Sequence, residues 1–200
     1  TAGPHVASET EQFGYAASVW SGDCAADGSI TLAPGDVKEC NITNDDVAPK
    51  LTINKFVVND DNGTKVVSDF PLFVDESGVT SGVQNTLTAG PHVASETEQF
   101  GYAASVWSGD CAADGSITLA PGDVKECNIT NDDVAPKLTI NKFVVNDDNG
   151  TKVVSDFPLF VDESGVTSGV QNTLTAGPHV ASETEQFGYA ASVWSGDCAA

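Results

Sequence analysis

The sequence contains no arginine, and its eight cationic residues face 29 aspartates and glutamates, which gives a formal net charge of −21. A protein with so few cations cannot neutralise phosphate groups, so nucleic acids and anionic membrane surfaces are excluded as partners. No apolar run approaches the roughly 18–20 residues that span a bilayer, so we expect no membrane insertion in this segment. Hydrophobic residues make up 40% of the chain, which is enough for a packed core and too much for a disordered acidic tail.

Catalytic motifs are missing as well. The sequence holds no G-x-S-x-G, no H-E-x-x-H and no phosphate-binding glycine loop. Its three histidines, His5, His92 and His179, have no nucleophile motif nearby. The protein is therefore not expected to be an enzyme, and no cofactor is predicted.

The chain repeats itself with a period of 87 residues. The sequence TAGPH at residues 1–5 returns at 88–92 and 175–179, and the copies are identical, so the chain comprises two full units and the first 26 residues of a third. This periodicity excludes a single large core and a unique catalytic centre. A chain that starts and stops inside a repeat is expected to be a fragment, so the absence of a visible signal peptide says nothing about targeting.

The five cysteines follow the repeat. Cys24 and Cys40 are 16 residues apart, as are Cys111 and Cys127, while the partner of Cys198 would lie past residue 200. Because no C-x-x-C occurs and the histidines are distant in sequence, a disulfide is favoured over half of a metal site. Disulfides in turn predict an oxidising, extracellular or cell-surface location.

The best domain boundary is the sequence DDVAPK at residues 45–50 and 132–137, because two acids and a proline interrupt helix and strand alike. A boundary there predicts one complete domain at residues 50–133. The C-terminal part of another domain precedes it at 1–46, and the N-terminal part of a third follows at 137–200.

Within the complete domain, short alternating segments rich in β-branched residues are separated by Gly, Pro and Asp turns, and no helical stripe is present. The predicted strands are 51–58, 70–75, 79–83, 86–88, 92–97, 102–107, 116–119 and 124–131. These segments predict an all-β fold of small, Ig-like β-sandwiches arranged in tandem as beads on a string.

Three motifs of the unit resemble a known family. They are LTINK at residues 51–55, SET at 95–97 ahead of FGY at 100–102, and the closing NITN at 128–131. In this order and spacing they are similar to collagen-adhesin B-type (CnaB) and SpaA-like prealbumin-fold domains, which build pilin shafts, adhesin stalks and long repetitive secreted proteins. The chain departs from that pattern in its cysteine pair and in the sequence EQF at 98–100, where the family often has a proline-containing turn. The resemblance implies a prealbumin-like sandwich in a stalk or filament, with copies of itself as partners.

The same resemblance implies an intramolecular isopeptide bond from Lys55 on the first strand to Asn131 on the last, assisted by Glu96. The chemistry needs a neutral amine, which burial favours by lowering a lysine pKa, and a protonated carboxylic acid that polarises the amide. Strand alternation places Lys55 and Asn131 on the apolar faces of their strands. In the alternative, Lys55 only pairs with Glu96 and Asn131 bonds to the backbone. The partial copies of this set are Glu9, Asn44, Lys142 and Glu183.

Paired acids at the domain junctions suggest weak calcium sites, although a solvated, self-repelling linker is favoured. These acids are Asp45, Asp46, Asp132 and Asp133. The sequence DDNG at residues 60–63 does not match EF-hand spacing and predicts a hairpin turn.

Two further features recur in every unit. N-glycosylation sequons, which predict a glycan coat in a host that glycosylates, lie at Asn41, Asn62, Asn128 and Asn149. One tryptophan and one tyrosine also recur, and core packing is favoured for them over a sugar-binding platform.

The sequence therefore predicts a secreted structural repeat that transmits tension along a filament or stalk. The alternative is a tandem adhesin that binds a glycan or host protein through avidity. That alternative requires an exposed pocket or aromatic patch on every repeat.

Overall fold

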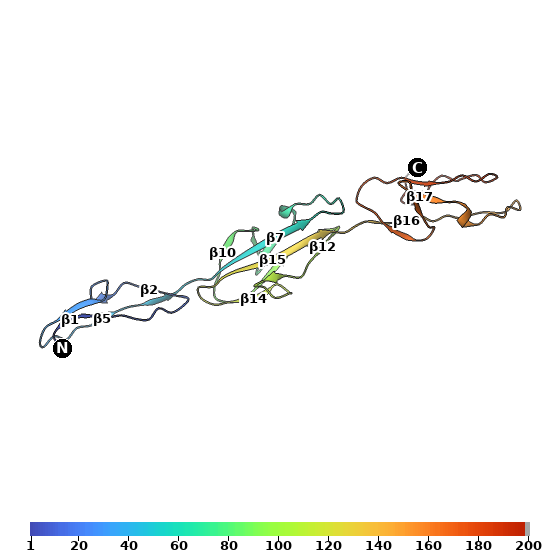
Figure 1. Cartoon of the computed structure of the whole chain (residues 1–200). Helices are drawn as coiled ribbons and strands as arrows, with labels where there is room; N and C mark the ends of the chain where they lie inside the picture. Colours follow the sequence, from blue (N-terminus) through green and yellow to red (C-terminus); the bar gives the residue numbers. More distant parts are fainter. Residues whose placement is uncertain (199–200) are drawn as a thin grey trace. The chain divides into compact units, whose positions relative to one another are not determined.

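The structure, a computed structural model, describes residues 1–198 (Figure 1). Within this range its regular elements are β-strands and two short 3-10 turns, with no α-helix. No helix of the described residues is long and apolar enough to cross a membrane. Contacts divide the chain into one unit of residues 1–58 and 65–131 and a second of residues 59–64 and 132 onward.

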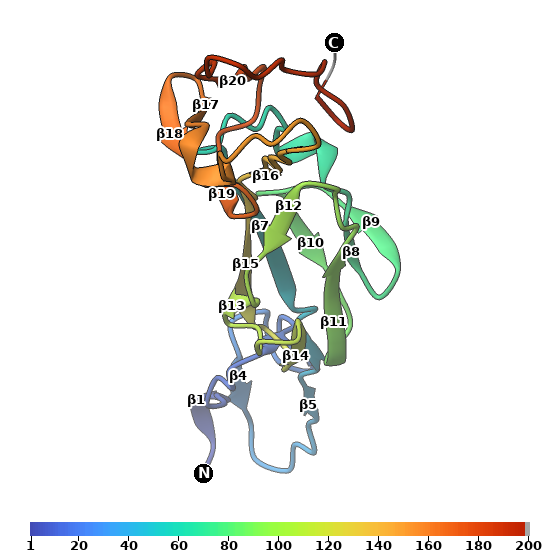
Figure 2. The ribbon, with the colours of Figure 1, turned by 90° about the vertical axis from the view of Figure 1, so that its right-hand side faces the viewer.

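The complete repeat is a sandwich of two sheets (Figure 2). One sheet has the order β10-β7-β15-β12, with β13 also paired to β15, and the other has the order β14-β11-β8-β9. The strands are β7 (Lys50–Val58), β8 (Leu72–Val74), β9 (Ser77–Val79), β10 (Gln84–Thr86), β11 (Gly90–Glu96), β12 (Tyr102–Ala104), β13 (Ser108–Gly109), β14 (Ser116–Leu119) and β15 (Val124–Asp133). The first and last strands of the repeat are therefore neighbours, which brings residues far apart in sequence side by side.

The core lies between the two sheets and follows the two-residue alternation of their strands. β7 buries every second residue from Leu51 to Lys55, and β15 buries every second residue from Cys127 to Asp133. The buried core comprises Leu51, Ile53, Leu72, Val74, Ala94, Trp107, Cys111, Ile117, Leu119, Cys127 and Ile129. The tryptophan of the repeat is thus a core residue.

Four local predictions were wrong in whole or in part. Residues 60–63 do not form a hairpin turn, because both edges of β7 are taken by β10 and β15, and the chain instead passes through the 3-10 turn η1 (Val67–Asp69) to β8 in the other sheet. Residues 80–83 of the predicted strand 79–83 are not a strand, because Val79 ends β9, the Val83 N–H donates to the Thr80 carbonyl at 3.1 Å, and Gly82 takes a φ of 75° that closes a turn there. The segment 102–107 ends its strand at Ala104. The strand predicted at 86–88 is observed two residues earlier, as β10.

The two incomplete repeats keep pairings of their complete counterpart. The N-terminal one pairs β1 with β4, β2 with β6 and β3 with β5; the C-terminal one pairs β16 with β19, and β17 with both β18 and β20. The N-terminal strands are β1 (Gly3–Val6), β2 (Tyr15–Ala17), β3 (Ser21–Gly22), β4 (Ser29–Leu32), β5 (Cys40–Asn41) and β6 (Asn44–Asp46). The C-terminal elements are β16 (Lys137–Thr139), η2 (Val154–Asp156), β17 (Leu159–Val161), β18 (Ser164–Val166), β19 (Gln171–Thr173) and β20 (Ala181–Glu183).

Candidate functional site

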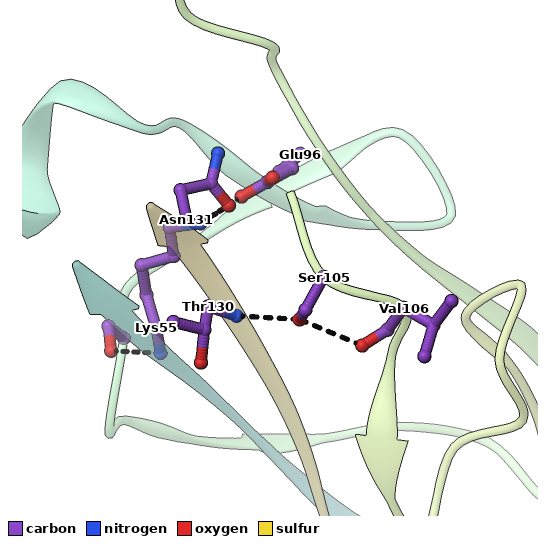
Figure 3. Close-up of polar contacts among 7 residues, drawn as sticks. Lys55, Glu96, Ser105, Val106, Thr130 and Asn131 are labelled. Atoms are coloured by element: carbon purple, nitrogen blue, oxygen red, sulfur yellow. Dashed lines mark hydrogen bonds and ion pairs between the residues drawn. The ribbon is translucent and has the colours of Figure 1, made fainter. Parts of the chain in front are cut away.

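Lys55, Glu96 and Asn131 meet inside the complete repeat (Figure 3). Lys55 comes from β7 and Asn131 from the neighbouring β15, while Glu96 ends β11 in the opposite sheet. The Lys55 Nζ lies 2.5 Å from Glu96 Oε2 and donates a hydrogen bond to Asn131 Oδ1. Lys55 is only 4% exposed and Asn131 only 1%. The structure therefore joins three polar groups in a site from which water is excluded.

Burial of this site works against the charged form of the lysine amine. Burial lowers the pKa of Lys55, against the opposing hydrogen bond and charge of Glu96. The ring of buried Phe70 covers the amine, with its centroid 4.5 Å from Nζ. Moving one proton from the amine to the carboxylate leaves a neutral pair, which avoids the cost of burying two charges. The product of that transfer is the nucleophilic form of lysine beside a carboxylic acid.

The second oxygen of the glutamate has a distinct environment. Glu96 Oε1 is buried, and among residues 1–198 it is the buried side-chain atom that has no hydrogen-bond partner. A buried polar atom without a partner is costly. This oxygen therefore leaves an open hydrogen-bonding position inside the site.

Neighbouring side chains hold the site in place. The Lys55 N–H donates to Ser81 Oγ at 2.9 Å, and the Thr130 N–H donates to Ser105 Oγ at 3.1 Å, beside Asn131 (Figure 3). Sequence reasoning missed Ser81, Ser105 and Phe70. Alternation within the predicted strand 70–75 does place Phe70 on the inward face. No sequence signal, however, indicates that the Phe70 ring packs over Lys55.

The incomplete repeats each hold part of the same set. In the C-terminal repeat, Lys142 Nζ lies 2.6 Å from Glu183 Oε2, and the Phe157 ring covers the amine at 4.6 Å. In the N-terminal repeat, Asn44 Nδ2 donates to Glu9 Oε2 at 3.0 Å. Within residues 1–198, only the complete repeat brings lysine, glutamate and asparagine together.

The cysteines form two disulfides. Cys24 is bonded to Cys40 and Cys111 to Cys127, each pair with its Cα atoms 5.2 Å apart, and Cys198 is free. Closing a loop of this length contributes about 3 kcal/mol in the chain-entropy model. The Cys111–Cys127 bridge encloses only a segment near the end of the repeat.

The acidic turn after β7 contacts the end of β15. Buried Asp133 accepts hydrogen bonds from the backbone N–H groups of Asp61, at 3.0 Å, and Gly63, at 2.5 Å. Ligand atoms of Asp60, Asp132 and Asp133 lie within 4.8 Å of one another. Burial and the charges of neighbouring aspartates raise the pKa of Asp132.

Desolvation acts to raise the pKa of Asp133, but the hydrogen bonds that its carboxylate accepts from backbone N–H groups have the larger combined effect. The pKa of Asp133 is therefore lowered. Asp45 and Asp46, by contrast, are exposed on β6. Calcium at these junction acids stays a prediction.

The sequons differ in accessibility. Asn62 and Asn149 are exposed at turns, with φ values of 65° and 62°. Asn128 is half-buried and accepts a hydrogen bond from Asn54 Nδ2 at 3.0 Å, whereas its copy Asn41 is exposed. The turn asparagines are thus exposed, although Asn62 Nδ2 donates to the Ala176 carbonyl at 3.1 Å, and Asn128 is engaged within the sheet. Glycosylation at these sequons stays a prediction.

A histidine clasp joins β11 to the turn between β8 and β9. His92 is buried, with Nδ1 2.6 Å from Asp75 Oδ2 and Nε2 2.8 Å from the Thr88 carbonyl oxygen. Because both partners are acceptors, both ring nitrogens must donate, so the imidazolium is the form that fits. The hydrogen bond to Asp75 raises the pKa of His92, and the reciprocal bond lowers the pKa of Asp75.

This clasp makes stability depend on pH. The folded state raises the pKa of His92 above its ordinary value of 6.5. Protonated His92 therefore stabilises the folded repeat fully at pH values below 6.5, and this stabilisation is lost as the pH rises through the pKa of the folded state. We therefore expect the complete repeat to melt at a lower temperature at pH 8 than at about pH 6, and His92→Gln to flatten that difference. Calorimetry across this range is the measurement, and His5→Gln, whose histidine bonds only to the Thr1 carbonyl, is the control. A melting temperature that rises over this interval would contradict the clasp.

Comparison with known proteins agrees with the fold. A family model described as a prealbumin-like fold domain, SpaA_2, matches residues 46–129 and again residues 133–200. No curated protein matches the chain. Because the two matches together cover more than half of the 200 residues, the chain belongs to the SpaA-type family of prealbumin-like fold domains and carries such domains in tandem.

Proposed function

We propose that this chain is a segment of an extracellular filament or cell-surface stalk, in which each complete repeat transmits tension through an isopeptide bond between Lys55 and Asn131. The observation that supports this most directly is the buried contact of the lysine amine with both the asparagine amide and the glutamate carboxyl. The SpaA-type family and the disulfides support a structural, extracellular role over an enzymatic one. The excess of 29 acidic over eight basic residues speaks against nucleic acid as a partner.

The reaction needs no group beyond the three side chains. The neutral Lys55 amine attacks Asn131 Cγ, and Glu96 hydrogen-bonds to the reacting atoms and relays a proton from Nζ to Nδ2. The new Nζ–Cγ amide bond forms, the Cγ–Nδ2 bond breaks, and one ammonia leaves. No oxidant or cofactor is consumed.

The strand arrangement supports a mechanical role. β7 and β15 are neighbours and run in the same direction (Figures 1 and 3), so the chain enters the repeat at one end of this pair and leaves at the other. Tension then passes along β7 to Lys55, across the bond to Asn131, and out at the end of β15. The 76-residue span between the bonded residues lies outside this path. The Cys111–Cys127 bridge cannot shield that span, because it closes only 16 residues of it.

The partners expected for such a segment are further copies of the same protein along or beside a filament. The net charge of −21 would keep neighbouring fibres apart in solution. Glycans at the exposed turn sequons would add to that separation.

The adhesin alternative has narrower support. Trp107 is in the core, so the repeat offers no tryptophan platform. The exposed aromatic side chains of the complete repeat are Phe56, which is 52% exposed on β7, and Phe100, which is fully exposed. These two phenylalanines lie on separate segments of the chain and are weaker support for sugar binding by stacking than an exposed tryptophan would be.

The isopeptide bond is tested by intact mass. We expect the reduced monomer of the full chain to be lighter than its sequence mass by one ammonia, and Lys55→Ala or Glu96→Gln to restore the full sequence mass. The matched control is Glu183→Gln, which alters the copy that has no asparagine beside it and should leave the loss of ammonia unchanged. A wild-type monomer at full sequence mass would refute the bond.

A further inference from the structure

The linker between the N-terminal repeat and the complete repeat is hydrogen-bonded to both of them. The Val47 N–H donates to the Gly14 carbonyl at 2.8 Å, which continues the pairing of β2 with β6 in the N-terminal repeat. The Val47 carbonyl oxygen accepts a hydrogen bond at 2.7 Å from the N–H of Gly122, which lies in the turn between β14 and β15 of the complete repeat. Both repeats belong to the first of the two units of the chain. One linker residue therefore ties two consecutive repeats together through its main chain.

The two turns that meet at this linker pack directly against each other. Gly14, which precedes β2, lies against Pro121 and Gly122. A methyl group added at Gly14 would overlap the Pro121 carbonyl oxygen, and one added at Gly122 would lie 2.6 Å from the Gly14 Cα atom. These separations are shorter than atoms in a packed protein tolerate. The contact therefore requires glycine on both of its sides.

Identical turns elsewhere in the chain show which features belong to this contact. Gly101 is the copy of Gly14 and has the same φ of 81°, while Gly35 is the copy of Gly122, with φ values of 89° and 79°. A methyl group at Gly101 or at Gly35 would meet no atom within 4 Å among residues 1–198. Gly14 is buried and Gly122 half-buried, whereas both copies are exposed. The positive φ is thus a property of each turn, and the close approach is a property of the joint between repeats.

The rest of the linker is restrained as well. Pro49 is fully buried, and its ring fixes its own φ. The same ring restricts the backbone of Ala48, which lies between Pro49 and the hydrogen-bonded Val47. The Lys50 N–H donates to the Asp123 carbonyl at 2.7 Å, in the turn that also bonds to Val47. The linker is therefore restrained at each residue from Val47 to Lys50.

We infer that this contact is a stiff joint, which holds two consecutive repeats in one fixed orientation. Tandem domains joined by small interfaces normally move relative to each other, so a restrained linker and a glycine-to-glycine contact mark a departure from that behaviour. The partner of the joint is the neighbouring repeat of the same chain. The segments that build it, residues 13–14, 45–50 and 120–123, recur with the 87-residue period. The inference goes beyond the proposed function, because the isopeptide bond acts within a repeat and the joint acts between two repeats.

The test is a distance measurement by pulsed electron spin resonance on the chain of residues 1–200. Nitroxide labels are attached to non-natural amino acids at positions 31 and 118, so the cysteines stay untouched. Thr31 and Thr118 are exposed copies of each other in the N-terminal and the complete repeat. A stiff joint should give one narrow distribution of distances between the two labels, whereas a flexible linker would give a broad one.

Substitution of the contacting glycines should release the joint. We expect Gly14→Ala and Gly122→Ala each to lose the narrow distribution, because the added methyl group forces the two turns apart. The matched controls are Gly101→Ala and Gly35→Ala, which introduce the same methyl group at a positive φ in identical local sequence but outside the contact. Both controls should keep the narrow distribution. They carry the same local strain, so they distinguish loss of the joint from strain within a turn.

Circular dichroism checks that the four variants are folded, and the two contact variants alter opposite sides of the joint. A broad distribution in the wild type, or a narrow one in both folded contact variants, would overturn the inference. EDTA should leave the wild-type distribution narrow, because the joint consists of main-chain contacts. Broadening by EDTA would assign the fixed orientation to a cation bound at the junction acids and would also overturn the inference.

Discussion

Under tension, Lys55→Ala should give the complete repeat an unfolding step that the wild-type chain does not show. With the bond in place, force bypasses the 76 residues between Lys55 and Asn131, so the repeat cannot lengthen by that span. Without it, those residues become extensible, apart from the 16 enclosed by the Cys111–Cys127 bridge. At about 3.4 Å per extended residue, the new step should be about 200 Å long with the bridge intact and about 250 Å after its reduction.

The measurement is single-molecule stretching of the full chain between its ends. The disulfide provides an internal length calibration. Reductant should lengthen the unfolding step by about 50 Å in Lys55→Ala and should have no such effect in the wild type. Lys142→Ala is the matched control, since this lysine lies outside the complete repeat. A wild-type chain that shows the long step would show that force does not pass through the bond.

The same bond should raise the melting temperature of the complete repeat, because it lowers the entropy of the unfolded chain. Closing a 76-residue loop stabilises a domain by about 4–5 kcal/mol in the chain-entropy model. For a domain of this size that corresponds to a melting temperature higher by about 20–30 °C. We expect Lys55→Met and Glu96→Gln each to lower the main calorimetric transition by at least this much.

The two variants disturb the buried site in different ways. The decrease in melting temperature that both variants have in common therefore measures the contribution of the isopeptide bond. Glu183→Gln, which changes the identical pair in the incomplete C-terminal repeat, should leave the main transition in place. Reductant alone should lower it by less than the loss of the isopeptide bond, because the Cys111–Cys127 loop is shorter. Melting temperatures of both variants within a few degrees of the wild type would contradict a covalent link.

The strands that build the site could be predicted from sequence because they alternate strictly. In β7 and β15 the period of two assigns Lys55 and Asn131 to the inward faces, and the buried residues observed follow that assignment. The pairing of the first strand with the last could not be predicted from the alternation. The alternation indicates which face of a strand a residue occupies, but it does not indicate which strand lies beside it. The resemblance to SpaA-like domains supplied that step, and the family match agrees with it.

Turns and cross-sheet contacts were less predictable. The sequence DDNG at residues 60–63 has the composition of a hairpin turn, but tertiary pairing of both edges of β7 overrides that local preference. The hydrogen bond of His92 to Asp75 and the packing of the Phe70 ring over the Lys55 amine each join residues 15 or more positions apart in separate segments of the chain. Side-chain contacts of this kind have no periodic signature in a single sequence.

The neighbouring positions of β7 and β15 impose an order of events during biosynthesis. Asn131 follows Lys55 by 76 residues, so the ribosome, or any channel that the chain crosses, must release nearly the whole repeat before the two side chains can meet. Contacts of such high sequence separation form late in folding. The lysine–asparagine bond can therefore form only after the final strand of a repeat has emerged, and once formed it would make that passage irreversible.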